Sequence, residues 1–184
     1  MLEKDFFVRD TLTVARELLG KVLYRRMGNT VYRGVISETE AYHGVEDLAC
    51  HCSKGKTPRT EIMFKEGGNI YVYLIYGMYH MLNFTTMPEN FPAAVLIRGI
   101  INPEISVNGN DFIPFHTKTD GPGKLTRVFQ IDKSLNTRPI HFQTGLWVEE
   151  GNWERNFEIV QTPRIGIDYA GAWKNKPWRF LIKK

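Results

Sequence analysis

The segment from Ile70 to Thr86 constrains the fold more than any other part of this 184-residue chain. Its first half, IYVYLIY, consists almost entirely of aromatic and β-branched residues, which favour strands. Gly77 interrupts this run, and the apolar and aromatic stretch MYHMLNFTT follows at 78–86. The pattern predicts a β-hairpin. A hairpin of this kind is stable only when further strands or helices pack against it.

A second hairpin is predicted nearer the N-terminus. Lys21–Arg26 and Val31–Tyr42 have strand composition, and the Gly-Asn pair between them suits a turn. Another apolar strand is expected at Ala93–Ile101, and 102–121 is rich in Asn, Pro, Asp and Thr, which is typical of a surface loop. The remaining expected elements are helices at Thr11–Leu19 and Pro122–Ile131 and short strands within LWVEE (146–150), FEIV (157–160) and PWRFLIKK (177–184). Together they predict one mixed α/β (α+β) domain spanning residues 1–184.

Composition excludes several protein classes. With 42% hydrophobic and 24% charged residues the chain has the balance of an ordinary globular protein. No apolar run approaches the roughly 20 residues of a membrane span, and the charged N-terminus lacks a signal peptide pattern, so we expect no membrane contact and a cytoplasmic location. The net charge of +4 permits a polyanionic partner without requiring one.

The two cysteines, Cys50 and Cys52, are expected to be reduced thiols. A disulfide between residues two positions apart would be strained. The Cys-His-Cys spacing is also too tight for a structural zinc site, which needs four ligands, so we expect no metal.

Two glutamates in the predicted 31–42 strand are candidate catalytic groups. Alternation places Ile36, Glu38, Glu40 and Tyr42 on one strand face, with the two carboxylates about 7 Å apart. Such a pair suits acid and base chemistry on a glycosidic bond, although a solvated strand face has the same pattern. Arg98, in an apolar strand, needs either a carboxylate partner or an anionic ligand, and the residues alone leave both interpretations open.

Tyrosines crowd the predicted 70–86 hairpin. Tyr71 and Tyr73 share one strand face and are expected to pack, whereas Tyr76 lies beside Gly77 at the hairpin tip. An exposed ring at such a tip is unfavourable unless a flat apolar partner receives it, and an unstacked base step in DNA is one such partner. Basic residues in two loops suit contacts with phosphates: these are Lys54, Lys56 and Arg59 in HCSKGKTPRT and Lys124 in GPGK.

Taken together, six segments resemble the alkyladenine (3-methyladenine) DNA glycosylase family. They are SETEAYHGVEDLACHCS, TPRTEIMF, IYVYLIYGMYHMLNF, AVLIRGI, GPGKLTRVFQIDKS and PRIGIDYAGAWKNKPWRF, and they cover nearly the whole chain in the family's order. The resemblance implies a single compact domain with an antiparallel β core and flanking helices, like the C-terminal domain of methionyl-tRNA formyltransferase. It also implies a monomeric, monofunctional glycosylase of base excision repair without a cofactor. This enzyme would flip damaged purines out of duplex DNA and hydrolyse the N-glycosidic bond, leaving an abasic site. 3-Methyladenine is the expected substrate, with hypoxanthine and ethenoadenine as further candidates.

The resemblance also assigns roles to individual residues. Glu40, the second glutamate of ETEAY, matches the general base, Arg98 matches the arginine that holds the attacking water, and Ile165 matches a position whose backbone carbonyl completes that cradle. The other matched positions are Tyr42, His51 and Tyr73 around the extruded base, Tyr76 as the wedge in the duplex, and Asn83, whose side chain disfavours the 2-amino group of guanine. Alternation alone does not choose Glu40 over Glu38.

Two departures from the family pattern stand out. The 102–121 segment is shorter and less helical than in larger relatives, and cysteines flank His51 where many relatives have Ala and Ser. Three other classes remain open at this stage: a carbohydrate hydrolase, a noncatalytic module that binds damaged DNA, and an RNA-binding domain. The Tyr-bearing hairpin disfavours the first class, and the coexistence of Glu40 with Arg98 disfavours the other two.

Overall fold

The protein is described here by a computed structural model that covers residues 1–151 and 157–183. Within these residues it is a single compact α+β domain built on one antiparallel sheet, which confirms the predicted fold class. The strands are β1 (Val22–Met27), β2 (Thr30–His43), β3 (Ile70–Ile75), β4 (Tyr79–Thr85), β5 (Ala93–Val107), β6 (Ile113–Pro114), β7 (Leu146–Glu149), β8 (Ile159–Thr162) and β9 (Arg179–Ile182). The helices are α1 (Lys4–Phe7), α2 (Thr11–Glu17) and α3 (Pro122–Val128), with short 3-10 helices η1 (His51–Lys54), η2 (Glu61–Phe64), η3 (Lys133–Leu135), η4 (Phe142–Thr144) and η5 (Asp168–Asn175).

The main path of the sheet runs β3-β4-β5-β2-β1-β7, and every pairing is antiparallel. Both predicted hairpins, β1–β2 and β3–β4, are confirmed. The second half of β2 lies between β5 and β9, and β8 extends the sheet beyond β9. The strands predicted in LWVEE, FEIV and PWRFLIKK are confirmed as β7, β8 and β9, and Lys184 of the last motif lies outside the described residues.

The prediction of a loop at 102–121 is wrong in its first part. Strand β5 continues to Val107, and Ile113–Pro114 pairs with it as β6. The extension forms because the first half of β2 offers partners, including an ion pair between Arg33 and Glu104 at 2.6 Å. The Asn and Pro residues of this segment favour a loop, and the sequence does not indicate the pairing because the partner strand lies about 70 positions away.

Strict alternation along β2 is also wrong at one position. The register between β2 and β5 shifts between Ile36 and Glu38 and again between Glu38 and Thr39. Because of this irregularity Ile36 joins the same core cluster as Ala41, which alternation places on the opposite face. The bulge therefore separates Ile36 from the glutamates and leaves Glu38, Glu40 and Tyr42 together.

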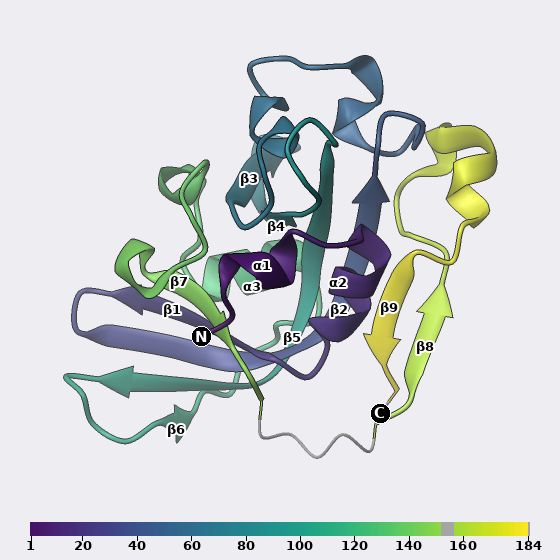
Figure 1. Cartoon of the computed structure of the whole chain (residues 1–184). Coiled ribbons are helices and arrows are strands. Elements are labelled where there is room, and N and C mark those ends of the chain that lie inside the picture. The colour runs from purple at the N-terminus through teal and green to yellow at the C-terminus, as the bar shows by residue number, and fades with distance from the viewer. Residues whose placement is uncertain (152–156, 184) are drawn as a thin grey trace.

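One face of the sheet carries most of the core. Helices α1 and α2 pack there, and Val14, Ala15 and Leu18 are completely buried. A smaller apolar cluster packs Met63 of the segment from 44 to 66 with Tyr71 of β3 and Ala94 of β5. This segment and η5 lie on either side of the end of β2 (Figure 1). Across the described part of the chain, no helix is long and apolar enough to cross a membrane.

Candidate active site

Glu40 lies in the centre of the sheet, in β2, and its side chain is completely buried. Its Oε1 accepts a hydrogen bond from the Ile165 backbone N–H at 2.8 Å and lies 3.4 Å from Arg98 Nε. Its Oε2 accepts a hydrogen bond from the Tyr42 hydroxyl at 2.8 Å. Burial raises the pKa of Glu40, and Arg98, the Ile165 N–H and the Tyr42 hydroxyl oppose that rise. The carboxylate is thus desolvated but held by two hydrogen bonds and by the charge of Arg98.

Arg98 projects from β5 and bridges the two glutamates. Its Nε donates to Glu38 Oε1 at 2.8 Å, and the same oxygen accepts a 2.6 Å hydrogen bond from Arg179 of β9. Burial alone lowers the pKa of Arg98, but the carboxylates of Glu40 and Glu38 outweigh it and raise the pKa. Arg98 therefore has carboxylate partners, and it also lines a pocket, so the two interpretations of the sequence are not exclusive.

That pocket has a volume of about 250 Å³. Aromatic and imidazole rings form much of its wall, and His51 and Tyr73 meet edge to face with centroids 4.5 Å apart. His51 Nδ1 lies 2.9 Å from the Tyr71 hydroxyl. Burial, aided by the charge of Arg59, lowers the pKa of His51 to about 4, so the imidazole is neutral at pH 7. The sequence-predicted base-binding residues Tyr42, His51, Tyr73 and Asn83 all line this pocket.

Asn83 lies in β4 at the wall of the same pocket and is buried. Its amide nitrogen donates to the backbone oxygens of Tyr71 and Met81, each at 3.2 Å. These contacts fix the plane of the carboxamide relative to the strand pair β3–β4. A rigid polar group at the wall of a pocket is suited to discriminate between ligands by their edge groups.

Tyr76 lies at the tip of the β3–β4 hairpin beside the pocket mouth, with 83% of its surface exposed. Its φ of 52° is in the left-handed region, and Gly77 follows at 70°. The neighbouring Met78 is also largely exposed. An aromatic ring held out on a tight turn is the expected geometry for a residue that contacts a partner rather than the core.

The three predicted phosphate contacts have different surroundings. Arg59 is exposed and its guanidinium carbon lies 5.0 Å from the centroid of the Tyr73 ring. Lys54 is exposed on η1, whereas exposed Lys124 of α3 is ion-paired with Asp120 at 2.9 Å. Arg59 is therefore the cation of the three that the structure ties to the pocket.

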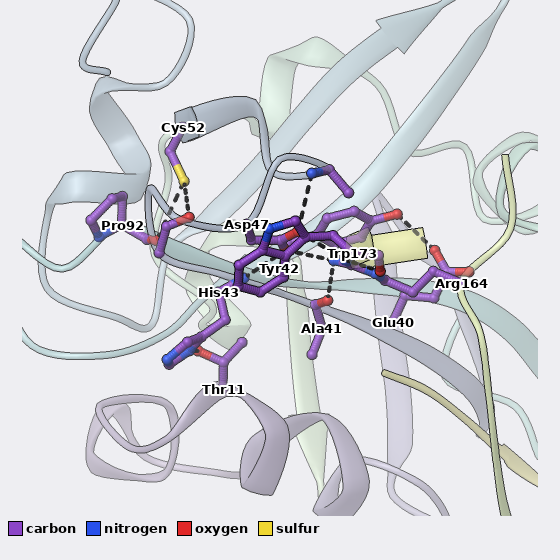
Figure 2. Close-up of polar contacts among 12 residues, drawn as sticks. Thr11, Glu40, Ala41, Tyr42, His43, Asp47, Cys52, Pro92, Arg164 and Trp173 are labelled. Carbon is purple, nitrogen blue, oxygen red and sulfur yellow. Dashed lines mark hydrogen bonds and ion pairs between the residues drawn. The ribbon is translucent and has the colours of Figure 1, made fainter. Parts of the chain in front are cut away.

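The role that the resemblance implies for the Ile165 backbone carbonyl stays a prediction. The structure shows a further contact of this residue, its N–H donating to Glu40. Sequence reasoning missed Tyr169, which lies on η5 at the pocket mouth with 71% of its surface exposed. It also missed the buried pair Asp47–Arg164 behind Tyr42 (Figure 2). Both sets fall inside motifs quoted above, but only the fold brings Asp47 and Arg164 together.

No cluster of three or more metal-ligating His, Cys, Asp or Glu side chains occurs in residues 1–151 and 157–183. Cys50 and Cys52 are free, buried thiols, and Cys52 Sγ donates to the backbone oxygen of Gly44 at 3.2 Å. Glu38 lines a larger groove of about 800 Å³, but none of the aromatic residues of the first pocket lines this groove. The 250 Å³ pocket, by contrast, is lined by Tyr42, Arg98 and Ile165, which all contact Glu40.

A buried carboxylate in contact with the residues that line a small aromatic pocket can act as a general base on a ligand bound there. The family model for methylpurine-DNA glycosylase (MPG) matches residues 5–184 of this chain. A Legionella pneumophila (strain Corby) protein named "Putative 3-methyladenine DNA glycosylase" is 44% identical over 182 residues, covering 99% of this chain and 94% of the relative. A protein of the same name from Methanocella arvoryzae is 46% identical over 189 residues, covering 100% of this chain and 92% of the relative.

The chain belongs to the methylpurine-DNA glycosylase family. It is accordingly a DNA repair hydrolase that cleaves N-glycosidic bonds, and damaged DNA is its substrate.

Proposed function

We propose that this enzyme rotates alkylated purines, 3-methyladenine first among them, out of duplex DNA into the 250 Å³ pocket and hydrolyses the N-glycosidic bond there. The observation that carries the proposal is Glu40, an internal carboxylate that contacts Tyr42, Ile165 and Arg98, and these three residues line the pocket of aromatic rings. The pocket is smaller than the roughly 300–1,000 Å³ clefts that receive drug-sized ligands. That volume suits a single nucleobase better than an oligosaccharide.

In the proposed mechanism Glu40 accepts a proton from a water molecule as the water oxygen forms a bond to C1′. The bond between C1′ and the purine nitrogen breaks, and its electron pair leaves with the base. Developing positive charge on the sugar is stabilised by the nearby carboxylate. An N-alkylated purine such as 3-methyladenine is cationic in DNA, so it departs as a neutral base without prior protonation. Neutral His51 is consistent with a reaction that needs no acid at this position.

Selectivity in the proposal comes from the pocket walls. Electron-rich rings such as Tyr42 and Tyr73 attract a cationic purine by about 0.5–2 kcal/mol through cation-π interaction. Asn83 would disfavour bases that carry a 2-amino group, because its position at the wall is fixed by two backbone contacts. Ethenoadenine and hypoxanthine are neutral, so we expect them to react more slowly than 3-methyladenine.

Outside the pocket, Tyr76 would enter the base stack and fill the space that the rotated nucleotide leaves. Arg59 and Lys54 would bind phosphates, which gives an affinity that falls with increasing salt. Arg98 would hold the attacking water together with Glu40. All these residues lie in one chain, so we propose that a monomer suffices, and sedimentation with a single-lesion duplex should give a 1:1 complex.

The test uses a duplex with one 3-methyladenine analogue or ethenoadenine, incubated with the enzyme and then treated with hot alkali to reveal abasic sites. Wild type should give alkali-labile product, and Glu40→Gln should lower the single-turnover rate by about 10²–10⁴-fold, the range for loss of a general base. Glu104→Gln is the matched control, because Glu104 lies in β5 away from the pocket. Equal rates for wild type and Glu40→Gln would remove Glu40 from its role, and absence of product with wild type on the 3-methyladenine duplex would overturn the proposal.

A further inference from the structure

Asp47 and Arg164 form an ion pair whose two side chains are completely buried. Arg164 Nη1 donates to Asp47 Oδ2 at 2.6 Å, and Nη2 donates to Oδ1 at 2.8 Å, so the pair is bidentate. Burying two charges has a large desolvation cost, and well-packed apolar side chains are often as stable or more stable in such positions. The pair therefore calls for an explanation other than stability.

The pair joins three segments around the end of β2. Figure 2 shows Asp47 and Arg164 with the residues around them. Arg164 also donates to the backbone oxygens of Ala41 (2.8 Å) and Trp173 (3.5 Å), and Asp47 accepts from the backbone N–H groups of His43 (3.2 Å) and Ala49 (3.0 Å). Strand β2, the turn that leads to His51, and η5 are thus held by one charged pair.

Both Tyr42 and Ile165, the two neutral donors to Glu40, depend on this pair. Ile165 directly follows Arg164 in the chain, and its N–H donates to Glu40 Oε1 at 2.8 Å. The Arg164 guanidinium carbon lies 4.7 Å from the centroid of the Tyr42 ring, and the Tyr42 hydroxyl donates to Glu40 Oε2 at 2.8 Å. Figure 2 shows Glu40, Tyr42 and Arg164 in this arrangement. Moving Arg164 would therefore displace both donors together.

We propose that the Asp47–Arg164 pair is a positioning device for catalysis: it aims the Tyr42 hydroxyl and the Ile165 N–H at Glu40 and so keeps the general base ionised and oriented. This inference rests on the role proposed above for Glu40 and adds two residues that do not touch the base or the sugar.

The titration of Glu40 distinguishes a positioning role from a purely structural one. If the pair only stabilised the fold, its removal would leave the pKa of Glu40 unchanged in the folded protein. Both donated hydrogen bonds lower the pKa of Glu40, so their loss should raise that pKa. The other charged or titratable groups facing Glu40 stay in place: Arg98 from β5, Glu38 from β2, Tyr73 from β3, and Arg179 from β9 through Glu38. A shift in the titration of Glu40 would therefore report on the two donors.

The key variant is the double replacement Asp47→Leu/Arg164→Met, which removes both charges and fills the site with apolar side chains. Arg164→Met alone leaves Asp47 buried without its partner and is expected to fold less stably. Arg164→Lys keeps a cation but not the bidentate contact and should give an intermediate result. Arg25→Met is the control: Arg25 is another buried arginine, which donates to backbone oxygens including Gly145 O, away from the pocket.

The experiment titrates the Glu40 carboxyl by ¹³C NMR, assigned by its absence in Glu40→Gln, and measures single-turnover rates on the lesion duplex across pH. In the folded double variant the midpoint of the Glu40 titration should move to higher pH, and the acidic limb of the pH–rate profile should move with it. The single-turnover rate at the plateau of that profile should fall by about 10- to 100-fold. Lesion-duplex affinity should change less than the rate. Arg25→Met should lose stability without either shift.

An unchanged Glu40 titration and rate in the folded double variant would overturn the positioning role. The two proposals can fail separately, because the NMR titration needs no turnover. A shifted titration in an enzyme whose wild type makes no abasic product would retain the positioning role and refute the proposed reaction.

Discussion

Replacing Tyr76 with alanine should weaken binding to lesion-containing DNA while leaving the fold almost unchanged. The ring is 83% exposed at the tip of the β3–β4 hairpin, so little buried area is lost. Surface replacements of this kind usually change the free energy of unfolding by less than about 0.5 kcal/mol. The backbone φ of 52° is equally unfavourable for alanine and tyrosine, so the turn adds no difference.

The expected loss of affinity follows from stacking. Contacts between a base and an aromatic side chain are worth about 1–3 kcal/mol each. At about 1.4 kcal/mol for each factor of ten, the dissociation constant for the lesion duplex should rise about 5- to 140-fold. Undamaged duplex is held mainly by phosphate contacts, so its affinity should change little. Tyr76→Phe keeps the ring and should resemble wild type.

Fluorescence anisotropy with a lesion duplex and a matched undamaged duplex, at one fixed salt concentration, measures both constants. Circular dichroism and thermal unfolding establish that each variant is folded. The wedge assignment would be refuted by unchanged lesion affinity in Tyr76→Ala. An equal loss for both duplexes would also refute it, since the ring would then act as a general DNA contact.

Three further predictions concern the pH dependence of the rate. The acidic limb of the single-turnover rate should lie above the ordinary glutamate range, because burial raises the pKa of Glu40 and only its ionised form accepts a proton; a limb at about pH 4.3 would contradict this. His51, whose pKa is about 4, should not contribute above that region, so His51→Gln should keep the position of the limb. Arg98→Met should move the limb to still higher pH, because Arg98 is the largest influence that lowers the pKa of Glu40, and an unmoved limb would argue against their coupling.

The sequence predicts the hairpins well because their signals are local. The apolar run at 70–76 and the glycine after it specify β3, the turn and β4 without reference to the rest of the chain. The extension of β5 beyond Ile101 and the bulge after Ile36 are different, because each depends on which strand lies alongside. Local composition therefore assigns a loop to 102–107 where cross-strand pairing produces a strand.

The same distinction separates the site residues. Alternation places Glu38 and Glu40 together but does not choose between them, since both belong to β2. In the structure the Glu40 side chain is completely buried whereas that of Glu38 is 18% exposed. Ile165, 125 positions away in the sequence, contacts only Glu40 of the two. The difference thus arises from tertiary packing, as does the Asp47–Arg164 pair, whose members are 117 positions apart.

Burial of Glu40 also has a consequence for stability, which a comparison of wild type with Glu40→Gln can measure. A carboxyl whose pKa is higher in the folded than in the unfolded protein stabilises the fold below its ordinary pKa, and this contribution is lost as pH rises through the folded-state pKa. Each tenfold difference in ionisation constant corresponds to about 1.4 kcal/mol.

Glutamine does not titrate, and Arg98 keeps Glu38 as a partner in the variant. The free energy of unfolding of Glu40→Gln relative to wild type should therefore increase between acidic and neutral pH, while all other titrating groups cancel in the difference. Urea unfolding at several pH values provides the measurement. Parallel curves for the two proteins would show that Glu40 ionises equally easily in the folded and unfolded chain, and the desolvated base on which the proposed reaction depends would not exist.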